Sequence, residues 1–158
     1  MNNMPAAGKP EPHHVAAITN VLSEVLNMDI EVKLVAERKK DGADSQIYWW
    51  KTAAEEVVRG KSHYQVVQLQ IEFFPLTRRV VIDFLCLPEE QKRKGKGRQI
   101  VERLLALFQS MGYEAVYLES QESSYPFWLK VGFAPSDPRR TSFPRAMVCW
   151  LADKLPAS

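Results

Sequence analysis

Apolar residues near the start of the chain follow two different spacings. They first recur every three or four residues, which is the period of one face of a helix. This helical set is Val15, Ile18, Leu22 and Leu26, and it predicts a first helix that continues through Met28. From 30 to 34 apolar residues alternate instead with charged ones, which predicts a strand. A leader that contains proline and glycine precedes the helix, and we expect it to be flexible through position 12.

The next part of the chain gives two weaker signals. Residues 39–45 are polar and contain an Asp-Gly pair, so they predict a turn. Residues 46–56 are ambiguous. The aromatic run at 47–50 favours a strand, whereas 51–58 has a composition that can begin a helix.

Residues 67–87 predict an antiparallel hairpin. From 67 to 73 apolar residues alternate with Gln and Glu, as in a strand with one exposed face. A turn that opens with proline follows at 75–78, and the run 80–87 after it is almost wholly apolar. Two strands joined by so short a turn pair antiparallel.

Helices and strands alternate in the rest of the chain. The next helix has a predicted buried stripe of Ile100, Leu104, Leu107, Phe108 and Met111. Gly112 can end that helix in a left-handed conformation. A strand at 116–119 then follows a crossover, so it should run parallel to 80–87. With a short helix at 125–131 and a last strand at 146–151, the pattern predicts an α/β fold: a mixed sheet with flanking helices.

A basic segment that contains glycine joins the apolar strand to the amphipathic helix. It reads Gln91-Lys92-Arg93-Lys94-Gly95-Lys96-Gly97-Arg98. A strand, turn and helix in this order aim backbone N–H groups and the positive end of the helix dipole at one point. Glycines let an anion approach the backbone closely. Five cations lie within 92–98, so the loop suits a ligand with several phosphate charges.

The spacing excludes two common phosphate loops. A Walker A loop needs a glycine five residues before its Gly-Lys-Ser/Thr, but Glu90 stands there and Gly97 follows the lysine. A dinucleotide-binding fingerprint needs a third glycine at the position of Ile100. Neither loop fits this chain.

The loop does fit the pattern Q/R-x-x-G-x-G/A, with Lys92 in place of Gln or Arg. In this it resembles the pyrophosphate loop of the GNAT superfamily of acyl-CoA-dependent N-acyltransferases. Leu85-Cys86-Leu87 matches the end of the preceding strand in that family, and the segment 127–133, FWLKVGF, matches a downstream motif. The resemblance covers about residues 64 to 135. We therefore expect a single GNAT-like domain at 13–158 after the leader at 1–12.

The resemblance implies acetyl-CoA as a co-substrate and a place for it. In the family two parallel strands splay apart, and the pantetheine lies between them against the backbone of the first strand. The N–H groups there would also polarise the thioester carbonyl. The binding residues implied are Leu85, Leu87, Lys92, Arg93, Lys94, Gly95, Lys96, Gly97 and Arg98.

Two positions depart from the family pattern. Pro88 comes one residue earlier than the usual proline, and Trp128 stands where many members have a tyrosine. An indole N–H cannot act as a general acid near neutral pH, so we expect Trp128 to pack in the core.

The tyrosine of the family commonly protonates the departing thiolate. The nearest replacement here is Tyr125, one helical turn earlier, with Ser123, Ser124 or bound water as alternatives. For the general base, Glu119 is the first choice because it ends the strand beside the expected site. Asp83 is the second, since burial in an apolar strand could raise its pKa. Deprotonation through water with no dedicated base also stays open.

Composition and charge indicate which compartment and which kinds of partner to expect. A chain of 158 residues with 46% hydrophobic content suits one domain, and a net charge of +2 makes the basic loop a local feature. Cys86 and Cys149 lie in apolar runs, so we expect buried free thiols in a reducing, cytoplasmic compartment. Neither a signal peptide nor a membrane span of ~18 apolar residues is visible.

Two pairs of residues could be misread as sites. Adjacent histidines point to different sides of a helix, so His13 and His14 suit a surface or capping role, and no metal is expected. Trp49 and Trp50 fit the core or an acceptor pocket, and we favour the core.

These observations favour an N-acetyltransferase that acts by direct attack of an amine on the thioester. The expected acceptor is a small-molecule or peptide amine of unknown identity, and a homodimer stays open. A non-catalytic acyl-CoA-binding or regulatory module is the main alternative. A nucleic-acid-binding domain is disfavoured, because no aromatic residue lies between the cations of the loop.

Overall fold

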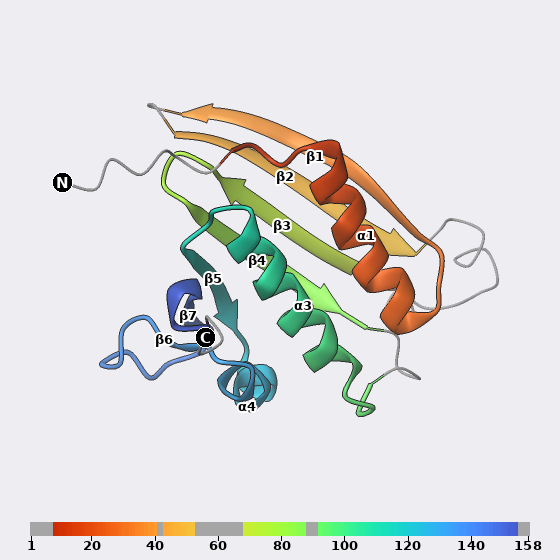
Figure 1. The fold of residues 1–158 in the computed structure, drawn as a ribbon. Coiled ribbons are helices and arrows are strands. Elements are labelled where there is room, and N and C mark those ends of the chain that lie inside the picture. The colour runs from red at the N-terminus through yellow and green to blue at the C-terminus, as the bar shows by residue number, and fades with distance from the viewer. Residues whose placement is uncertain (1–7, 41–42, 53–67, 88–91, 155–158) are drawn as a thin grey trace.

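A computed structural model describes residues 8–40, 43–52, 68–87 and 92–154. In this part of the chain seven strands form a single mixed sheet in the order β1-β2-β3-β4-β5-β7-β6. Helices α1 and α3 lie side by side on one face of it (Figure 1). The predicted α/β class is confirmed. The elements are α1 (Pro12–Leu26), β1 (Ile30–Lys40), β2 (Ala43–Thr52), β3 (Gln68–Phe74), β4 (Arg79–Cys86), α3 (Lys96–Ser110), β5 (Ala115–Ser120), η3 (Glu122–Ser124), α4 (Tyr125–Lys130), β6 (Ala134–Pro135), β7 (Arg145–Trp150) and η4 (Leu151–Lys154).

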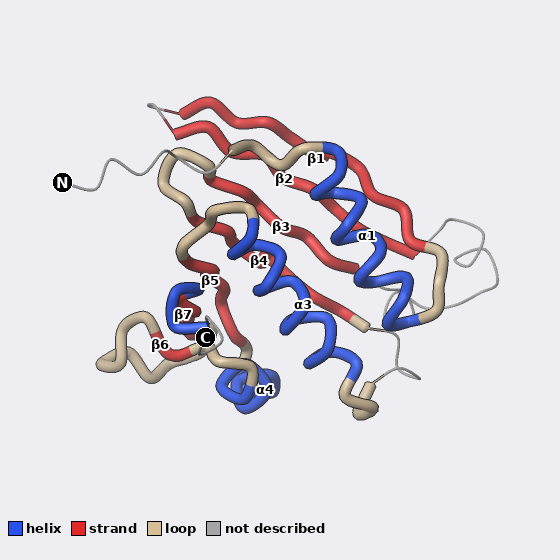
Figure 2. Tube along the Cα trace, in the orientation of Figure 1, coloured by secondary structure: helices blue, strands red, loops and turns tan. Residues whose placement is uncertain are grey.

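The strand pairings confirm the predicted connections. β1 to β4 pair antiparallel in succession, which includes the predicted hairpin of β3 and β4. β5 runs parallel to β4 after the crossover through α3, as predicted. β7 then pairs antiparallel with β5 and with the two-residue strand β6 (Figure 2). The sequence pattern did not predict β6, because two residues are too few for a period.

The prediction for residues 39–45 was wrong at both ends of the segment. β1 extends to Lys40 and β2 begins at Ala43, so only positions 41 and 42, which lie outside the described residues, separate the two strands. Cross-strand pairing explains the difference, since Lys39 faces Asp44 and opposite charges stabilise such a pair. Residues 46–52 are strand, and the rest of the ambiguous segment also lies outside the described residues.

Helix α1 begins at Pro12, where a missing N–H costs nothing. Its first turn has a capping box: the Glu11 side chain accepts from the backbone of His14, and His14 Nδ1 accepts from the Glu11 N–H at 3.1 Å. The expected capping role is therefore confirmed for His14. His13 Nδ1 lies 3.2 Å from Glu11 Oε2, so these three side chains converge within 4.8 Å.

The core lies between the sheet and the two helices. Alternate residues of β3, namely Leu69, Ile71 and Phe73, are fully buried there. Phe73 meets Phe108 of α3 edge-on, with ring centroids 5.9 Å apart. The predicted α3 stripe is confirmed, with Leu107 only partly buried at its margin.

The two tryptophans of β2 point to opposite faces of the sheet. Trp50 is fully buried, and its Nε1 donates to Thr19 Oγ1 of α1 at 3.0 Å, so the expected core role is confirmed for this residue. Trp49 is half-buried on the other face, and its Nε1 has no hydrogen-bond partner in the structure.

The cysteines are free, and only one is buried. Cys149 lies in the core as predicted. Cys86 is exposed, so the prediction for it was wrong. Its neighbour Leu85 packs against the core, and successive strand residues point to opposite faces, which turns Cys86 away from the helices. None of the described helices has both the length and the hydrophobicity needed to cross a membrane.

Gly112 ends α3 with φ of 94°, as the sequence predicted. We expect Gly112→Ala to lower the free energy of unfolding by about 1 kcal/mol, because an L side chain is strained at positive φ. Gly8→Ala is the matched control, since open space surrounds that position. Denaturant unfolding of both variants checks this, and equal effects would contradict it.

Candidate active site

The parallel strands β4 and β5 pair over only part of their length. Pairing joins Arg79–Val81 to Ala115–Tyr117. Beyond these residues β4 stays paired with β3 up to Cys86, and β5 stays paired with β7 up to Ser120. The parting of parallel strands that the family resemblance implied is therefore present.

A β-bulge in β4 accounts for the parting. The register with β3 shifts between Gln70 and Ile71, whose partners are Phe84 and Ile82. Asp83 is thus the extra residue of the bulge. A bulge bends its strand and increases the local twist, which turns the end of β4 away from β5.

The basic loop leads directly into α3. The helix begins at Lys96 and has Gly95 as its N-cap, with φ of 75°. In the described part of the chain no side chain caps this helix start. The first N–H groups of a helix have no intrahelical partner. Apart from its chain neighbours, no atom of the described residues lies within 4 Å of the place where a Gly95 side chain would be. The backbone is therefore open to an anion, as the sequence suggested.

The cations of the loop are not equivalent. Lys92, Arg93 and Lys94 are exposed, and Arg93 has φ of 65°, a conformation that is rare for residues other than glycine. Arg98 instead donates to Glu102 one turn along α3, at 2.7 Å. An exposed pair of this kind contributes only about 0.3–0.5 kcal/mol, so Arg98 can exchange Glu102 for a ligand at little cost.

Three distant segments meet at Gly97. A side-chain carbon at this position would lie 3.4 Å from the Phe127 ring of α4 and 3.6 Å from Leu87 Cδ1. The structure therefore brings the loop, the residue that follows β4 and the helix after β5 to one place. Sequence reasoning had assigned these segments to the site one by one.

Trp128 packs in the core, as predicted. It is 8% exposed, and it meets Phe127 and Phe133 edge-on with ring centroids 4.9 and 5.3 Å away. An indole in this position fills space on the core side of α4.

Tyr125 begins α4 and has a partner that the sequence did not predict. Its hydroxyl accepts from Arg145 Nη1 at 3.1 Å, and its ring meets Phe143 edge-on at 5.5 Å. Arg145 begins β7, twenty residues away along the chain. No motif or spacing pointed to this pair, because only the pairing of β7 with β5 brings Arg145 beside α4.

The serines before α4 are exposed or engaged in their own turn. Ser124 Oγ donates to the Gln121 carbonyl at 3.3 Å and lies 3.4 Å from Ser120 Oγ. Ser123 is exposed. Among the described residues, Tyr125 is the candidate acid from the sequence whose hydroxyl accepts a hydrogen bond from a cationic side chain.

The two candidate bases lie on the sheet face opposite α1 and α3. Glu119 is exposed near the end of β5. Asp83 lies at the bulge, and its Oδ2 accepts from Gln70 Nε2 at 3.1 Å. Asp83 is exposed as a whole residue, yet local desolvation of its carboxyl at the bulge raises the pKa of that group. The nearby Glu72 also raises this pKa, while the hydrogen bond from Gln70 and the charge of Arg38 oppose the shift. The structure thus places an acid with a raised pKa where β4 leaves β5.

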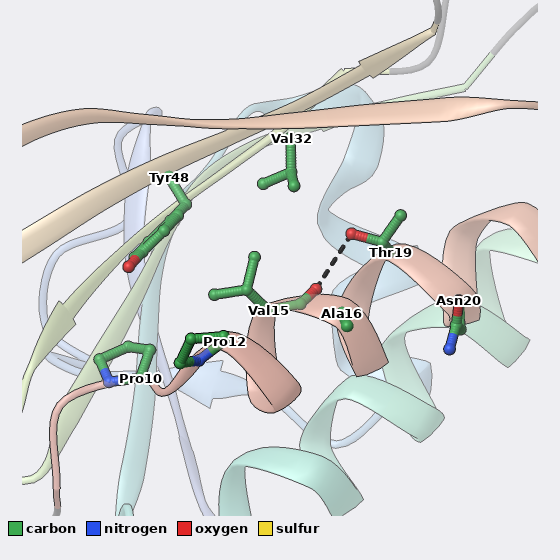
Figure 3. A pocket seen from close by; sticks show the side chains of 8 residues that line it. All are labelled: Pro10, Pro12, Val15, Ala16, Thr19, Asn20, Val32 and Tyr48. Atoms are coloured by element: carbon green, nitrogen blue, oxygen red, sulfur yellow. Dashed lines mark hydrogen bonds between the residues drawn. The ribbon is translucent and has the colours of Figure 1, made fainter.

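Two pockets lie away from the loop. One of about 450 Å³ lies between α1 and the outer strands, with Val15, Val32 and Tyr48 among its walls (Figure 3). Another of about 440 Å³ is lined by Tyr117, Trp150 and residues of the 132–138 segment. None of the site residues expected from the sequence lines either pocket.

Comparison with known families agrees with this geometry. The model of the acetyltransferase (GNAT) domain matches residues 51–142, which is more than half of the chain. The chain belongs to the GNAT family. A search of curated proteins gave no match.

Solved structures similar to this GNAT domain are distant in sequence. A GNAT-family acetyltransferase from Staphylococcus aureus Mu50 is 11% identical over 68% of each chain, with a TM-score of 0.47. A spermidine N-acetyltransferase SpeG chimera from Vibrio cholerae and hSSAT is 12% identical over 69% of this chain and 68% of its own, with a TM-score of 0.44. The PaiA N-acetyltransferase from Thermoplasma acidophilum, in complex with coenzyme A, is 14% identical over 82% and 65%, with a TM-score of 0.45.

Gly97 allows the sharpest test of the loop. We expect Gly97→Glu to abolish binding of CoA, because it places a negative charge where the backbone would meet the pyrophosphate. Gly97→Ala is the matched control, since its methyl group would only touch Phe127 and Leu87, and it should bind CoA nearly as well as the wild type. Isothermal calorimetry measures both, and circular dichroism checks the fold. Tight binding by the glutamate variant would contradict this site.

The raised pKa of Asp83 predicts a pH-dependent stability. The folded state holds the proton of the Asp83 carboxyl more tightly than the unfolded state does. The free energy of unfolding therefore falls as the pH rises from the unfolded pKa of this carboxyl through its raised folded pKa. Asp83→Asn removes this cost, and its melting temperature relative to the wild type should be higher at about pH 7 than at about pH 3.5. Glu119→Gln, at an exposed acid on the same face, is the control. A difference independent of pH would refute the assignment.

Proposed function

We propose that this GNAT domain transfers an acetyl group from acetyl-CoA to the amine of a small molecule or peptide, in the cytoplasm. The observation that carries the proposal is the meeting of three segments at Gly97, beside the place where β4 and β5 part. A helix start with an open backbone, next to strand ends that have lost each other's pairing, suits a long ligand with a diphosphate at one end.

Each part of acetyl-CoA has a counterpart in this arrangement. The pyrophosphate would accept from the backbone N–H groups between Gly95 and Arg98, with Lys92, Arg93, Lys94 and Lys96 screening its charge. The pantetheine would lie along β4 beyond the bulge. The backbone of Leu85 and Leu87 would hydrogen-bond to it there and polarise the thioester carbonyl.

The reaction forms a C–N bond and breaks a C–S bond. The amine attacks the thioester carbon and loses a proton, and the collapse of the tetrahedral intermediate leaves an electron pair on sulfur. Both candidate bases are exposed, and the position of Asp83 at the bulge together with its raised pKa favours it over Glu119. Tyr125 would supply the proton that the departing sulfur takes up.

A non-catalytic acyl-CoA-binding module remains the second candidate. The observation in its favour is Trp128, which packs in the core at the position of the family's tyrosine. The two candidates share the binding site and differ only in turnover.

Acetyl-CoA should raise the melting temperature of the protein, because its binding site exists only in the folded state. At a concentration 100 times the dissociation constant the stabilisation is about 2.7 kcal/mol. Differential scanning fluorimetry with acetyl-CoA, CoA and a single-stranded oligonucleotide measures it. An unchanged melting temperature at millimolar acetyl-CoA would contradict the proposed function.

Thiol release from acetyl-CoA then separates the enzyme from the binding module. The assay uses a panel of amines with a polyamine, an amino acid and a lysine-containing peptide. Release that depends on one class of amine supports the transferase. Binding of acetyl-CoA without release by any amine favours the module.

A further inference from the structure

Arg145 is a partly buried cation without an ion pair. It begins β7 opposite Ser120, at the end of β5. Its Nη1 donates to the Tyr125 hydroxyl at 3.1 Å, and its Cζ lies 5.0 Å from the centre of the same ring. Its Nε is buried and has no hydrogen-bond partner among the described residues. Among the described residues no carboxylate forms an ion pair with it.

The direction of this hydrogen bond constrains the proton of the tyrosine. A guanidinium can only donate, so the phenol oxygen must accept. The single O–H of Tyr125 therefore points to some other acceptor, and the described part of the chain offers it none. Phe143 packs edge-on against the ring and fixes its orientation.

The position of Tyr125 relates this proton to the reaction. The residue lies two positions before Phe127, whose ring approaches Gly97 at the start of α3. It also follows the end of β5, beyond the point where this strand leaves β4. The Tyr125 hydroxyl therefore lies on the side of the parted strands where the loop and α4 would surround the ligand.

We propose that Arg145 is a positioning residue that holds the Tyr125 hydroxyl with its proton free for the sulfur of CoA. This inference rests on the proposed function. As the C–S bond breaks, its electron pair stays on sulfur, the Tyr125 proton moves to that sulfur, and CoA leaves as a thiol. The phenolate left on Tyr125 accepts a charge-assisted hydrogen bond from Arg145 and regains a proton from water.

The pair would thus replace the tyrosine that the family carries one turn later. Trp128 occupies that position as a core residue and cannot donate a proton to the thiolate. Tyr125 alone would have a freely rotating O–H. Arg145 removes this freedom by occupying the phenol oxygen from the side of β7.

A purely structural arginine would leave a different signature. Its loss would lower the stability of the fold and change the affinity for every CoA analogue alike. A positioning role instead predicts a loss that depends on the sulfur atom. Desulfo-CoA, in which hydrogen replaces the thiol, provides this comparison without any acceptor amine.

The experiment is calorimetric titration of CoA and desulfo-CoA into the 158-residue chain. The wild type should prefer CoA by roughly five- to tenfold, the usual worth of one hydrogen bond. Tyr125→Phe and Arg145→Gln should each abolish the preference, and the double variant should lose no more than either single variant. Arg139→Gln is the matched control and should keep the preference, because that side chain is 92% exposed and, within the described part of the chain, pairs with Asp137 rather than with Tyr125.

Each other outcome has one meaning. Failure of the wild type to bind either ligand would reject the proposed function, and this inference with it. Binding without a preference, a preference that survives Arg145→Gln, or additive losses in the double variant would reject only the positioning role. Should Arg145→Gln fail to fold in thermal unfolding, Arg145→Met takes its place, since it keeps the length of the side chain and removes the donors.

Discussion

The candidate site depends on the loss of pairing between β4 and β5, which leaves backbone N–H and C=O groups of these strands without each other as partners. Beyond Val81 and Tyr117 the two strands have lost their shared ladder, although each keeps its other neighbour. Unpaired strand groups cost stability unless water or a ligand satisfies them. The bulge at Asp83 bends β4 and so ends its pairing with β5. One extra residue therefore makes the difference between two parallel strands paired along their length and two strands that part.

The basic loop and the start of α3 add features that favour an anion beside the parted strands. A helix start without a side-chain cap, preceded by exposed cations, favours an anion through its N–H groups and its dipole. Because Phe127 and Leu87 both approach Gly97, the position of the loop is fixed by packing as well as by its own turn. Under the proposed function, acyl-CoA binding and core packing would therefore depend on the same contacts.

In the proposed function, the role of the family's tyrosine moves one turn along α4. Trp128 meets Phe127 and Phe133, and this aromatic cluster anchors α4 to the sheet. One turn earlier, Tyr125 faces β7 and has a guanidinium at its hydroxyl. Aromatic packing at Trp128 thus occurs together with a polar pair at Tyr125. The proposed acid, Tyr125, and the proposed base, Asp83, lie on opposite faces of the sheet.

The sequence by itself determined most of the elements and the chemistry of the loop. The alternation in β3, the apolar run of β4 and the helical stripe of α3 are local patterns that burial enforces, so they could be read from spacing. Gly95 and Gly97 identified the loop because only certain residues allow a backbone to meet an anion.

Tertiary structure decided the features that depend on which segments become neighbours in space. The ladder between β1 and β2 made strands of a polar segment that resembled a turn, because pairing satisfies the backbone whatever the hydropathy. The bulge placed Asp83, already a candidate base from the sequence, where β4 leaves β5, and strand alternation exposed Cys86. The pairing of β7 with β5 brought Arg145 to Tyr125 across twenty residues of chain. A contact of this kind depends on which strands are neighbours, and no spacing along the chain encodes it.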